Sequence, residues 1–273
     1  MLRIRAAARE STGDVHDVNQ DAYCMKVAET SIGDVALMVV CDGMGGLARG
    51  ELASATVIRA FGDWFDERLP ELLARATADP ARLLPQVRED WPALIHDVDR
   101  RIADYGERHR IDLGTTLSAL FVARGRYLVV HVGDSRVYTL YGGRATQLTA
   151  DQTLIAHELE QGNISLDLAR IHPQRNVLMQ CVGCIDDLRP QYRVGRGKPG
   201  MGFLLCSDGL CHQVTSSEIY YMLDPGVVRS EGALSDALCD LIVLARGRYE
   251  QDDITAVAVQ AYEEASVGVE RRS

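Results

Sequence analysis

The sequence lacks the long apolar run that a membrane-spanning helix requires. None of its hydrophobic stretches approaches the roughly 20 residues of such a span. The first residues, Met1 to Arg5, also lack the apolar core of a signal peptide. We therefore expect a soluble, cytoplasmic protein that has no membrane partner.

Positive charge is also in short supply. The chain has 29 Lys and Arg against 39 Asp and Glu, which gives a formal net charge of −10. A surface of this sign repels the phosphates of nucleic acids and acidic lipids, so we expect no nucleic-acid partner. If the substrate itself carries phosphate, bound metal must reverse the sign of the field locally.

The cysteines do not form a regular framework of pairs. Their number is seven, and most lie within apolar runs, which suits reduced, buried thiols; these are Cys24, Cys41, Cys206 and Cys239. The run from Cys181 to Cys184 has the spacing of half a zinc site, but no second pair or nearby histidine completes it. We do not expect structural zinc.

The chain is long enough to bury one large core. It has 273 residues, of which 47% are hydrophobic, and no internal repeat or low-complexity tract divides it. We expect a single domain over residues 1–262, followed by a short tail over residues 263–273.

Strand patterns outnumber helix patterns along the chain. Apolar runs predict strands over residues 2–8, 22–28, 35–41, 115–122, 127–132, 188–194, 201–207 and 254–261. Helical spacing of apolar residues marks 57–65, 84–105, 216–223 and 231–245. Within the second of these helices, Pro92 should mark a start, a break or a kink. Because the helices come in blocks, the pattern favours an antiparallel α/β (α+β) sandwich over a doubly wound parallel sheet.

One segment interrupts the series of strands. Residues 149–180 are polar and contain two short helical fragments, at 154–160 and 166–170. We interpret this segment as an inserted flap.

Acidic residues stand where buried strands open into turns. Asp42-Gly43 and Asp208-Gly209 each follow an apolar run, and Asp21, Asp134 and the pair Asp252-Asp253 occupy similar places. Four carboxylates within about 5 Å would repel one another by about 20 kcal/mol, which exceeds the roughly 5–15 kcal/mol of a domain's stability. Such a cluster needs divalent cations or protons. Oxygen ligands without His or Cys select Mg²⁺ or Mn²⁺ over zinc.

These aspartates belong to seven short motifs that follow one another along the chain. The motifs are Asn19-Gln20-Asp21, Asp42-Gly43-Met44-Gly45-Gly46 with Gly50-Glu51-Leu52-Ala53-Ser54, Gly114-Thr115-Thr116, Gly133-Asp134-Ser135-Arg136, His172-Pro173-Gln174-Arg175-Asn176-Val177, Ser207-Asp208-Gly209 and Asp252-Asp253-Ile254-Thr255. The ordered set resembles the PPM (protein phosphatase 2C) family of metal-dependent serine/threonine phosphatases, and its compact bacterial members in particular. The resemblance runs from about residue 10 to residue 260.

The resemblance implies a four-layer α-β-β-α sandwich, in which helices flank two central antiparallel sheets. It also implies two Mn²⁺ or Mg²⁺ ions, a third and weaker one, and no other cofactor. Asp42 would bridge the first two ions, the Gly43 carbonyl would bind one of them, and Asp208 and Asp252 would complete a shell. Asp21 would hold water beside the metals, and Asp134 would share the third ion with Asp208.

The implied reaction is hydrolysis of phosphoserine and phosphothreonine on proteins. A hydroxide that bridges the two metals would attack phosphorus directly, without a covalent phosphoenzyme. The implied partners are phosphorylated proteins and an opposing serine/threonine kinase, and we expect a monomer. The flap would cover the site and influence substrate choice.

The chain departs from the family pattern at three positions. His16 stands where relatives carry an arginine that holds the substrate phosphate, and our hypothesis is that Arg49 or Arg175 partly substitutes. Met44 replaces the histidine of some eukaryotic relatives, so the leaving group must take its proton from another source. His212 stands where relatives often have an acidic residue, which bears on the third metal.

The sequence supports other functions less well. The run from Gly43 to Ala48 fits the dinucleotide pattern Gly-x-Gly-x-x-Ala, but Asp42 would face the pyrophosphate and no acidic strand end follows about 20 residues later. No Gly-x-Ser-x-Gly motif supports a serine hydrolase. A phosphatase-like, non-catalytic protein that binds phosphoproteins is the alternative left open, and His16 is its main support.

Overall fold

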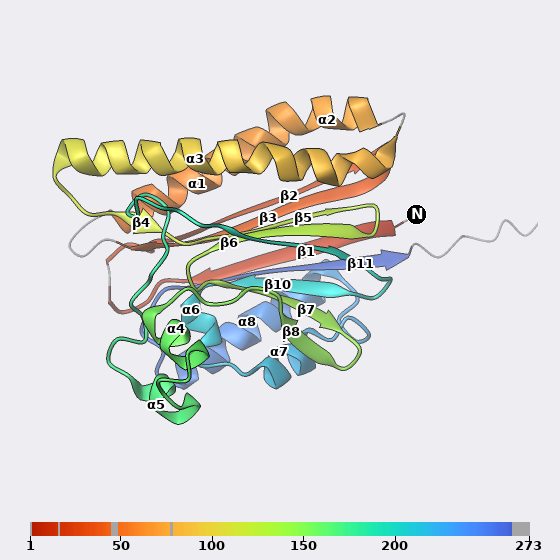
Figure 1. Cartoon of the computed structure of the whole chain (residues 1–273). Coiled ribbons are helices and arrows are strands. Elements are labelled where there is room, and N and C mark those ends of the chain that lie inside the picture. Colours follow the sequence, from red (N-terminus) through yellow and green to blue (C-terminus); the bar gives the residue numbers. More distant parts are fainter. Residues whose placement is uncertain (1, 16, 45–48, 77–78, 264–273) are drawn as a thin grey trace, which may run out of the picture.

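The computed structural model describes residues 2–15, 17–44, 49–76 and 79–263. Two antiparallel sheets lie face to face, and helices cover the outer face of each (Figure 1). This arrangement confirms the predicted four-layer α-β-β-α sandwich.

The first sheet contains β3 (Gly33–Met44), the strand that carries Asp42. Its strands follow the order β2 (Asp21–Thr30), β3, β5 (Leu117–Ala123), β6 (Arg126–Val132) and β9 (Gln191–Arg196), and the short β4 (Gly114–Thr115) pairs with the end of β3. Strand β3 is buried on both faces, because alternate residues of a strand point to opposite sides. Leu37 and Val39 pack toward the helices, whereas Met38 and Val40 pack toward the second sheet.

The second sheet brings the two ends of the described chain together. Its strands follow the order β1 (Leu2–Ser11), β11 (Ile254–Glu263), β10 (Gly202–Cys206), β7 (Arg136–Tyr141) and β8 (Arg144–Gln147). The hairpin between β7 and β8 turns at Gly142 and Gly143, both of which have positive φ.

Helices on the first sheet form one layer. They are α1 (Gly50–Asp63), a π-helical turn (Trp64–Arg68), α2 (Leu69–Ala76), a 3-10 turn (Pro80–Arg82) and α3 (Leu83–His109). Trp91 of α3 anchors this layer through edge-to-face contacts with Phe61, Trp64 and Phe121.

The second sheet is covered by α6 (Asp208–Cys211), α7 (Ser216–Leu223) and α8 (Glu231–Gly247).

Of the three effects predicted for Pro92, a helix start and a helix break are excluded, while a kink stays a prediction. Pro92 lies inside α3, which continues through it over 27 residues, so Pro92 neither starts nor breaks the helix. A proline inside a helix costs about 3 kcal/mol. The neighbouring side chains of Val87, Trp91 and Ile95 are fully buried, and burying each contributes about 1.5–3 kcal/mol, which outweighs that cost.

The strand predicted at 188–194 is shifted in the structure, where β9 spans Gln191–Arg196. Pro190 cannot donate a hydrogen bond to a ladder, and the backbone N–H of Arg189 donates to Gln180 Oε1 at 2.7 Å instead. The residues before β9 therefore belong to a loop.

Two cysteine interpretations also need correction. Cys24, Cys41 and Cys206 are buried free thiols as expected, but Cys239 is exposed, because the buried stripe of α8 passes through Leu234, Leu238 and Leu241. Cys181 and Cys184 are joined by a disulfide, which the sequence did not predict.

Residues 149–180 contain two short helices, as expected for the flap. They are α4 (Leu154–Glu160) and α5 (Leu166–Ile171), whose first turns are capped by Thr153 and Ser165. In Figure 1 both helices lie outside the sandwich at one of its ends. Among the described residues, no helix combines the length and apolar character needed to cross a bilayer.

Candidate metal centre

The five aspartates predicted as metal ligands lie at strand ends on one edge of the sandwich. Asp21 begins β2 and is the register partner of Asp42 near the end of β3. Asp134 follows β6, Asp208 follows β10 and Asp252 precedes β11. Because neighbouring strands run antiparallel, the end of one lies beside the start of the next.

The electrostatics of Asp42 show that these carboxyl groups share one environment. Burial raises the pKa of the Asp42 carboxyl well above its ordinary range, and neighbouring negative charges raise it further. Those charges belong to Asp21, Asp208, Asp134 and Asp252. The other four predicted side chains are therefore close enough to Asp42 to act on its carboxyl group.

Each of three other aspartates has a raised pKa for the same two reasons. For Asp134 and Asp252, burial is the larger cause and the charge of Asp208 is the next. Burial also raises the pKa of Asp21 to about 8, although hydrogen bonding by Ser207 partly opposes the shift. The protein thus holds carboxyl groups in a place that disfavours their charged form.

The donor set fits hard divalent cations. Asp21 Oδ1 and Asp208 Oδ1 are buried and have no hydrogen-bond partner. Within the described residues, no Lys or Arg forms an ion pair with the five carboxylates. Basic groups nearby are His212, whose Nδ1 lies 3.7 Å from Asp208 Oδ2, Arg246, whose Nη1 donates to the Asp252 backbone carbonyl at 2.7 Å, and Arg136, whose charge acts on Asp134. Buried charges are costly without a partner, and oxygen-only sites suit Mg²⁺ or Mn²⁺.

Side chains alone do not complete a metal shell. In the part of the chain that the structure describes, no three His, Cys, Asp or Glu side chains are placed so that they could hold an ion by themselves. The full ligand set therefore stays a prediction, and it requires further oxygen donors such as the Gly43 carbonyl or water.

Two threonines fix the backbone of Asp42. The Asp42 N–H donates to Thr116 Oγ1 at 2.8 Å, and its carbonyl accepts from Thr115 Oγ1 and from the Thr116 N–H, both at 2.9 Å. Thr116 Oγ1 also lies 2.7 Å from Ser135 Oγ, next to Asp134. The motif at 114–116 thus positions one aspartate and is linked to a second.

Two further residues tie the second sheet to the first at this edge. Ser207 Oγ donates to Asp21 Oδ2 at 2.6 Å and accepts from the Thr255 N–H at 2.9 Å. Asp253 accepts from the backbone N–H groups of Gly13 at 2.8 Å and Gln20 at 2.7 Å. Neither Ser207 nor Asp253 was assigned a role from the sequence, because the residues that they hold lie far away along the chain.

Gly43 is required by close packing of the backbone. A Cβ at this position would lie 2.3 Å from the Gly50 carbonyl oxygen and 2.6 Å from that of Gln20. Alanine at position 43 should therefore force the loop apart, destabilise the fold by about 1–3 kcal/mol and displace Asp42. Urea denaturation measures the first effect.

The matched control for this prediction is Gly232→Ala. A Cβ on Gly232, in the first turn of α8, would meet nothing within 4 Å. That variant should be neutral or stabilising by up to about 1 kcal/mol, since alanine favours helix. Equal stability of the two variants would contradict the packing argument.

Of the three residues predicted to bind phosphate, two lie within the described residues. Arg49 donates to Tyr105 Oη at 2.9 Å, and Arg175 is exposed on the flap. Within the described residues, no hydrogen bond or ion pair joins either one to the acidic cluster. His16 lies outside the described residues.

The fold argues against the other enzyme classes. A dinucleotide site needs parallel strands with crossover helices, whereas β3 pairs antiparallel with both of its neighbours; Gly45 and Ala48 lie outside the described residues. A serine hydrolase needs a serine bonded to a histidine, whereas the Ser207 hydroxyl donates its hydrogen bond to Asp21. His131 is buried beside Ser118 Oγ, and its pKa is lowered to about 4 by burial, which agrees with a core histidine.

Comparison with known proteins decides the family. The family model described as Protein phosphatase 2C matches residues 11–238. The chain belongs to the protein phosphatase 2C family.

Relatives of this protein phosphatase 2C chain are bacterial. It is 33% identical over 231 residues to the serine/threonine protein phosphatase PstP of Mycobacterium tuberculosis. This alignment covers 84% of this chain but 41% of PstP. The chain is 29% identical over 231 residues to the protein phosphatase PhpP of Streptococcus pneumoniae, covering 84% of this chain and 87% of that one. The chain thus spans less than half of the first relative's length.

A solved structure agrees with the fold of this protein phosphatase 2C chain. The catalytic domain of PstP in complex with two manganese ions superposes with a TM-score of 0.75 at 29% identity, covering 96% of this chain and all of that one. These relatives are phosphatases by name, so nothing among them favours the non-catalytic phosphoprotein binder.

Proposed function

We propose that this chain is a metal-dependent phosphatase that hydrolyses phosphoserine and phosphothreonine on proteins. The observation that carries the proposal is the group of buried and half-buried aspartates with raised pKa values, none of which forms an ion pair with Lys or Arg among the described residues. In a member of the protein phosphatase 2C family, such a group is best explained as a site for divalent cations.

The proposed ligands are the aspartates at the strand ends. Two Mn²⁺ or Mg²⁺ ions would be held by Asp42, the Gly43 carbonyl, Asp208 and Asp252, while Asp134 would take part in a third site. When bound, these cations lower the pKa of water and neutralise charge that develops on the phosphoryl oxygens. The buried oxygens of Asp21 and Asp208 that lack hydrogen bonds support this assignment.

The chain's own residues supply the fixed geometry. Thr115 and Thr116 fix the backbone of Asp42 by hydrogen bonds. The position of this residue is therefore set before substrate binds, which reduces the entropy lost on binding. Ser207 orients Asp21, which we propose holds water beside the cations. We propose that the substrate phosphate is bound by His16, Arg49 and Arg175, for which Arg49 would have to release its hydrogen bond to Tyr105.

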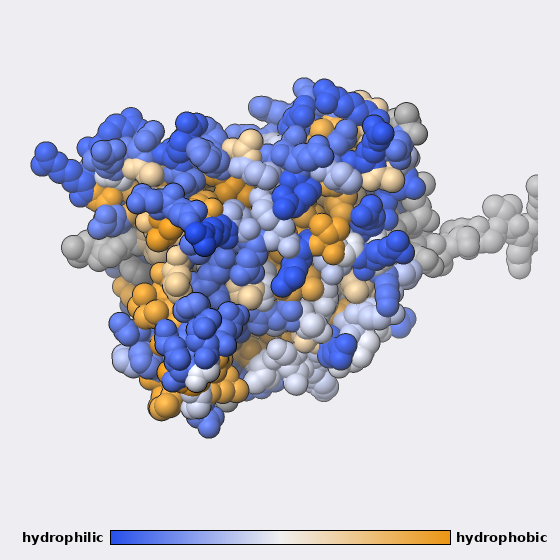
Figure 2. Space-filling model, viewed as in Figure 1, coloured by the Kyte–Doolittle hydropathy of each residue, from blue (hydrophilic) through white to orange (hydrophobic). Residues whose placement is uncertain are grey.

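The flap is the proposed contact for the phosphoprotein. Its helix α5 exposes Leu166, Leu168 and Ile171, and in Figure 2 apolar residues gather at the lower left, where Figure 1 places α5. Exposed apolar groups of this kind commonly mark a surface that binds another protein. We propose a single phosphatase domain over residues 1–262 that acts as a monomer in the cytoplasm and opposes a serine/threonine kinase.

The test is a metal titration of phosphate release from a phosphothreonine peptide and from p-nitrophenyl phosphate. Turnover should require Mn²⁺ or Mg²⁺, stop on addition of EDTA and be lost in Asp208→Asn. The intact mass of the reacted enzyme should show no covalent phosphate. Binding of the phosphopeptide without release of phosphate at any metal concentration would support the non-catalytic alternative instead.

A further inference from the structure

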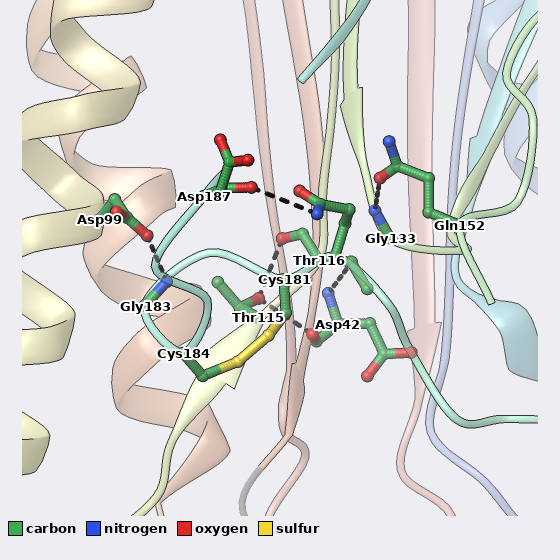
Figure 3. Close-up of a disulfide and its surroundings, with 11 residues drawn as sticks. Asp42, Asp99, Thr115, Thr116, Gly133, Gln152, Cys181, Gly183, Cys184 and Asp187 are labelled. Atoms are coloured by element: carbon green, nitrogen blue, oxygen red, sulfur yellow. Dashed lines mark hydrogen bonds between the residues drawn. A yellow bond between two sulfur atoms is a disulfide. The ribbon is translucent and has the colours of Figure 1, made fainter. Parts of the chain in front are cut away.

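The Cys181–Cys184 disulfide closes a short loop where the chain leaves the flap (Figure 3). The two Cα atoms are 6.1 Å apart, a separation that protein disulfides commonly adopt. Cys181 is buried, whereas Cys184 is exposed, so a reagent in solution can reach one end of the bond.

The loop is packed closely against α3 and β4. The Gly183 N–H donates to Asp99 Oδ1 at 2.7 Å, and Gly183 has a φ of +96°. A Cβ on Gly183 would lie 2.2 Å from Ile102 Cγ2, and a Cβ on Gly114 would lie 2.7 Å from Cys184 Sγ. The conformation of the closed loop therefore fixes how it fits between the helix and the strand.

One residue separates this loop from the backbone of Asp42. Val182 exchanges two backbone hydrogen bonds with Thr115, at 3.0 and 2.9 Å. Thr115 Oγ1 then donates to the Asp42 carbonyl at 2.9 Å, and Figure 3 shows the disulfide, Thr115 and Asp42 lying side by side. A movement of Val182 would therefore shift Thr115, and through Thr115 the backbone of Asp42.

A second connection runs to the base of the flap. Just before the loop, the Met179 N–H donates to the Gln152 carbonyl at 2.8 Å. The side chain of Gln152 accepts from the Gly133 N–H at 2.8 Å, next to Asp134 (Figure 3). The disulfide loop thus adjoins two segments that carry proposed metal ligands.

We propose that Cys181 and Cys184 form a thiol–disulfide switch that controls how firmly the chain holds Asp42. In the disulfide form, the closed loop keeps Val182 against Thr115 and the metal site keeps its shape. In the dithiol form, the loop gains freedom, and the Thr115 segment and the base of the flap loosen. The effect on catalysis rests on the phosphatase function proposed above.

The site suits a redox role more than a structural one. Disulfides in reducing compartments are usually transient or redox-sensing, and the chain is expected to be cytoplasmic. A bridge between residues three apart closes a very short loop, so it contributes less to global stability than a long-range bridge would. Its main effect is therefore local.

The chemistry is thiol–disulfide exchange with a dithiol reductant. One thiolate of the reductant attacks Cys184 Sγ, the bond to Cys181 breaks, and the Cys181 thiolate takes a proton from water. The second thiolate of the reductant then attacks its own sulfur in the mixed disulfide and releases Cys184. The protein gains two electrons and two protons, and the reductant becomes a cyclic disulfide.

The experiment compares the full chain in its oxidised form with the same chain reduced by dithiothreitol. Alkylation under denaturing conditions, read by intact mass, should label five cysteines before reduction and all seven after it. Hydrogen exchange at Thr115, Thr116 and Val182 should be roughly fivefold faster or more in the reduced chain. The Mn²⁺ concentration for half-maximal phosphate release should rise by a similar factor.

Variants separate this pair from the other thiols. Cys181→Ser with Cys184→Ser should behave like the reduced chain in both redox conditions. Cys239→Ser, which removes an exposed cysteine elsewhere, should respond to dithiothreitol as the unaltered chain does. Because the unaltered chain can be compared in both states, the test stands even if the double variant does not fold.

The outcomes distinguish the two proposals. Unchanged exchange at Thr115, Thr116 and Val182 after full reduction would overturn the switch, whatever the activity. Faster exchange in a chain that releases no phosphate in either state would support the switch and overturn the phosphatase function.

Discussion

Replacing Asp42 with asparagine is expected to lower phosphate release by on the order of 1,000-fold while leaving the fold intact. Asparagine retains the size of the side chain and the backbone hydrogen bonds to Thr115 and Thr116. The change removes only the negative charge at the centre of the acidic group. Measurement of kcat/KM on a phosphothreonine peptide, with saturating Mn²⁺, gives the size of the loss.

The same substitution should have the opposite effect on stability. Burial and the neighbouring carboxylates disfavour a charge on Asp42, so removing it relieves repulsion in the metal-free chain. The Tm in EDTA should therefore rise or stay unchanged while activity falls, which rules out simple unfolding as the cause. The control is Asp236→Asn, an identical change at an exposed position of α8, which should alter neither quantity. Activity of Asp42→Asn within threefold of the unaltered chain would remove Asp42 from the proposed mechanism.

Much of the fold could be predicted because its signals are local. The continuous apolar run of β3, which is buried on both faces, and the helical spacing in α3 are both visible in short windows of sequence. The errors arose where an interaction from elsewhere in the fold decided the outcome. The helix passes through Pro92 because its buried face holds it against the sheet, and β9 begins late because a loop bond at Arg189 competes with the ladder.

In the candidate site too, some residues could be predicted from local sequence and others could not. The aspartates could be found because each lies beside a recognisable start or end of a strand, and the order of the motifs pointed to a known family. The residues that hold them could not, since Ser207 and Asp21 are 186 positions apart and Asp253 and Gly13 are 240 apart. No sequence pattern of period two or 3.6 encodes a hydrogen bond over such a distance.

The disulfide was missed for a different reason. A Cys-x-x-Cys run is compatible with zinc, free thiols or a bridge, and the choice depends on the backbone that surrounds it. Here Gly183 has a positive φ and fits against Ile102, which brings the two cysteines within reach of each other. The sequence shows Gly183 but not the helix that it approaches.

The metal-free chain should lose stability as the pH rises from about 4 to about 8, and Asp21 should account for part of the loss. Burial raises the pKa of Asp21 to about 8 in the folded chain, compared with 3.8 for the free side chain. Between these values the folded chain keeps a proton that the unfolded chain has released. Unfolding then releases protons, so each such group lowers the free energy of unfolding by at most about 1.4 kcal/mol per pH unit.

The measurement is the Tm in EDTA between pH 5 and pH 8, for the unaltered chain and for Asp21→Asn. The variant lacks this titration, so its Tm should fall less steeply, while the general repulsion from a net charge of −10 affects both chains equally. Added Mn²⁺ should oppose the fall, because ligand binding to the folded state contributes about 2.7 kcal/mol at 100 times the Kd, and the carboxylates bind it better as they lose protons. Parallel pH profiles for the two chains in EDTA would show that Asp21 is not held in the uncharged form. A rise in metal-free stability with pH would go further, since it would mean that the carboxylates already have cationic partners within the protein.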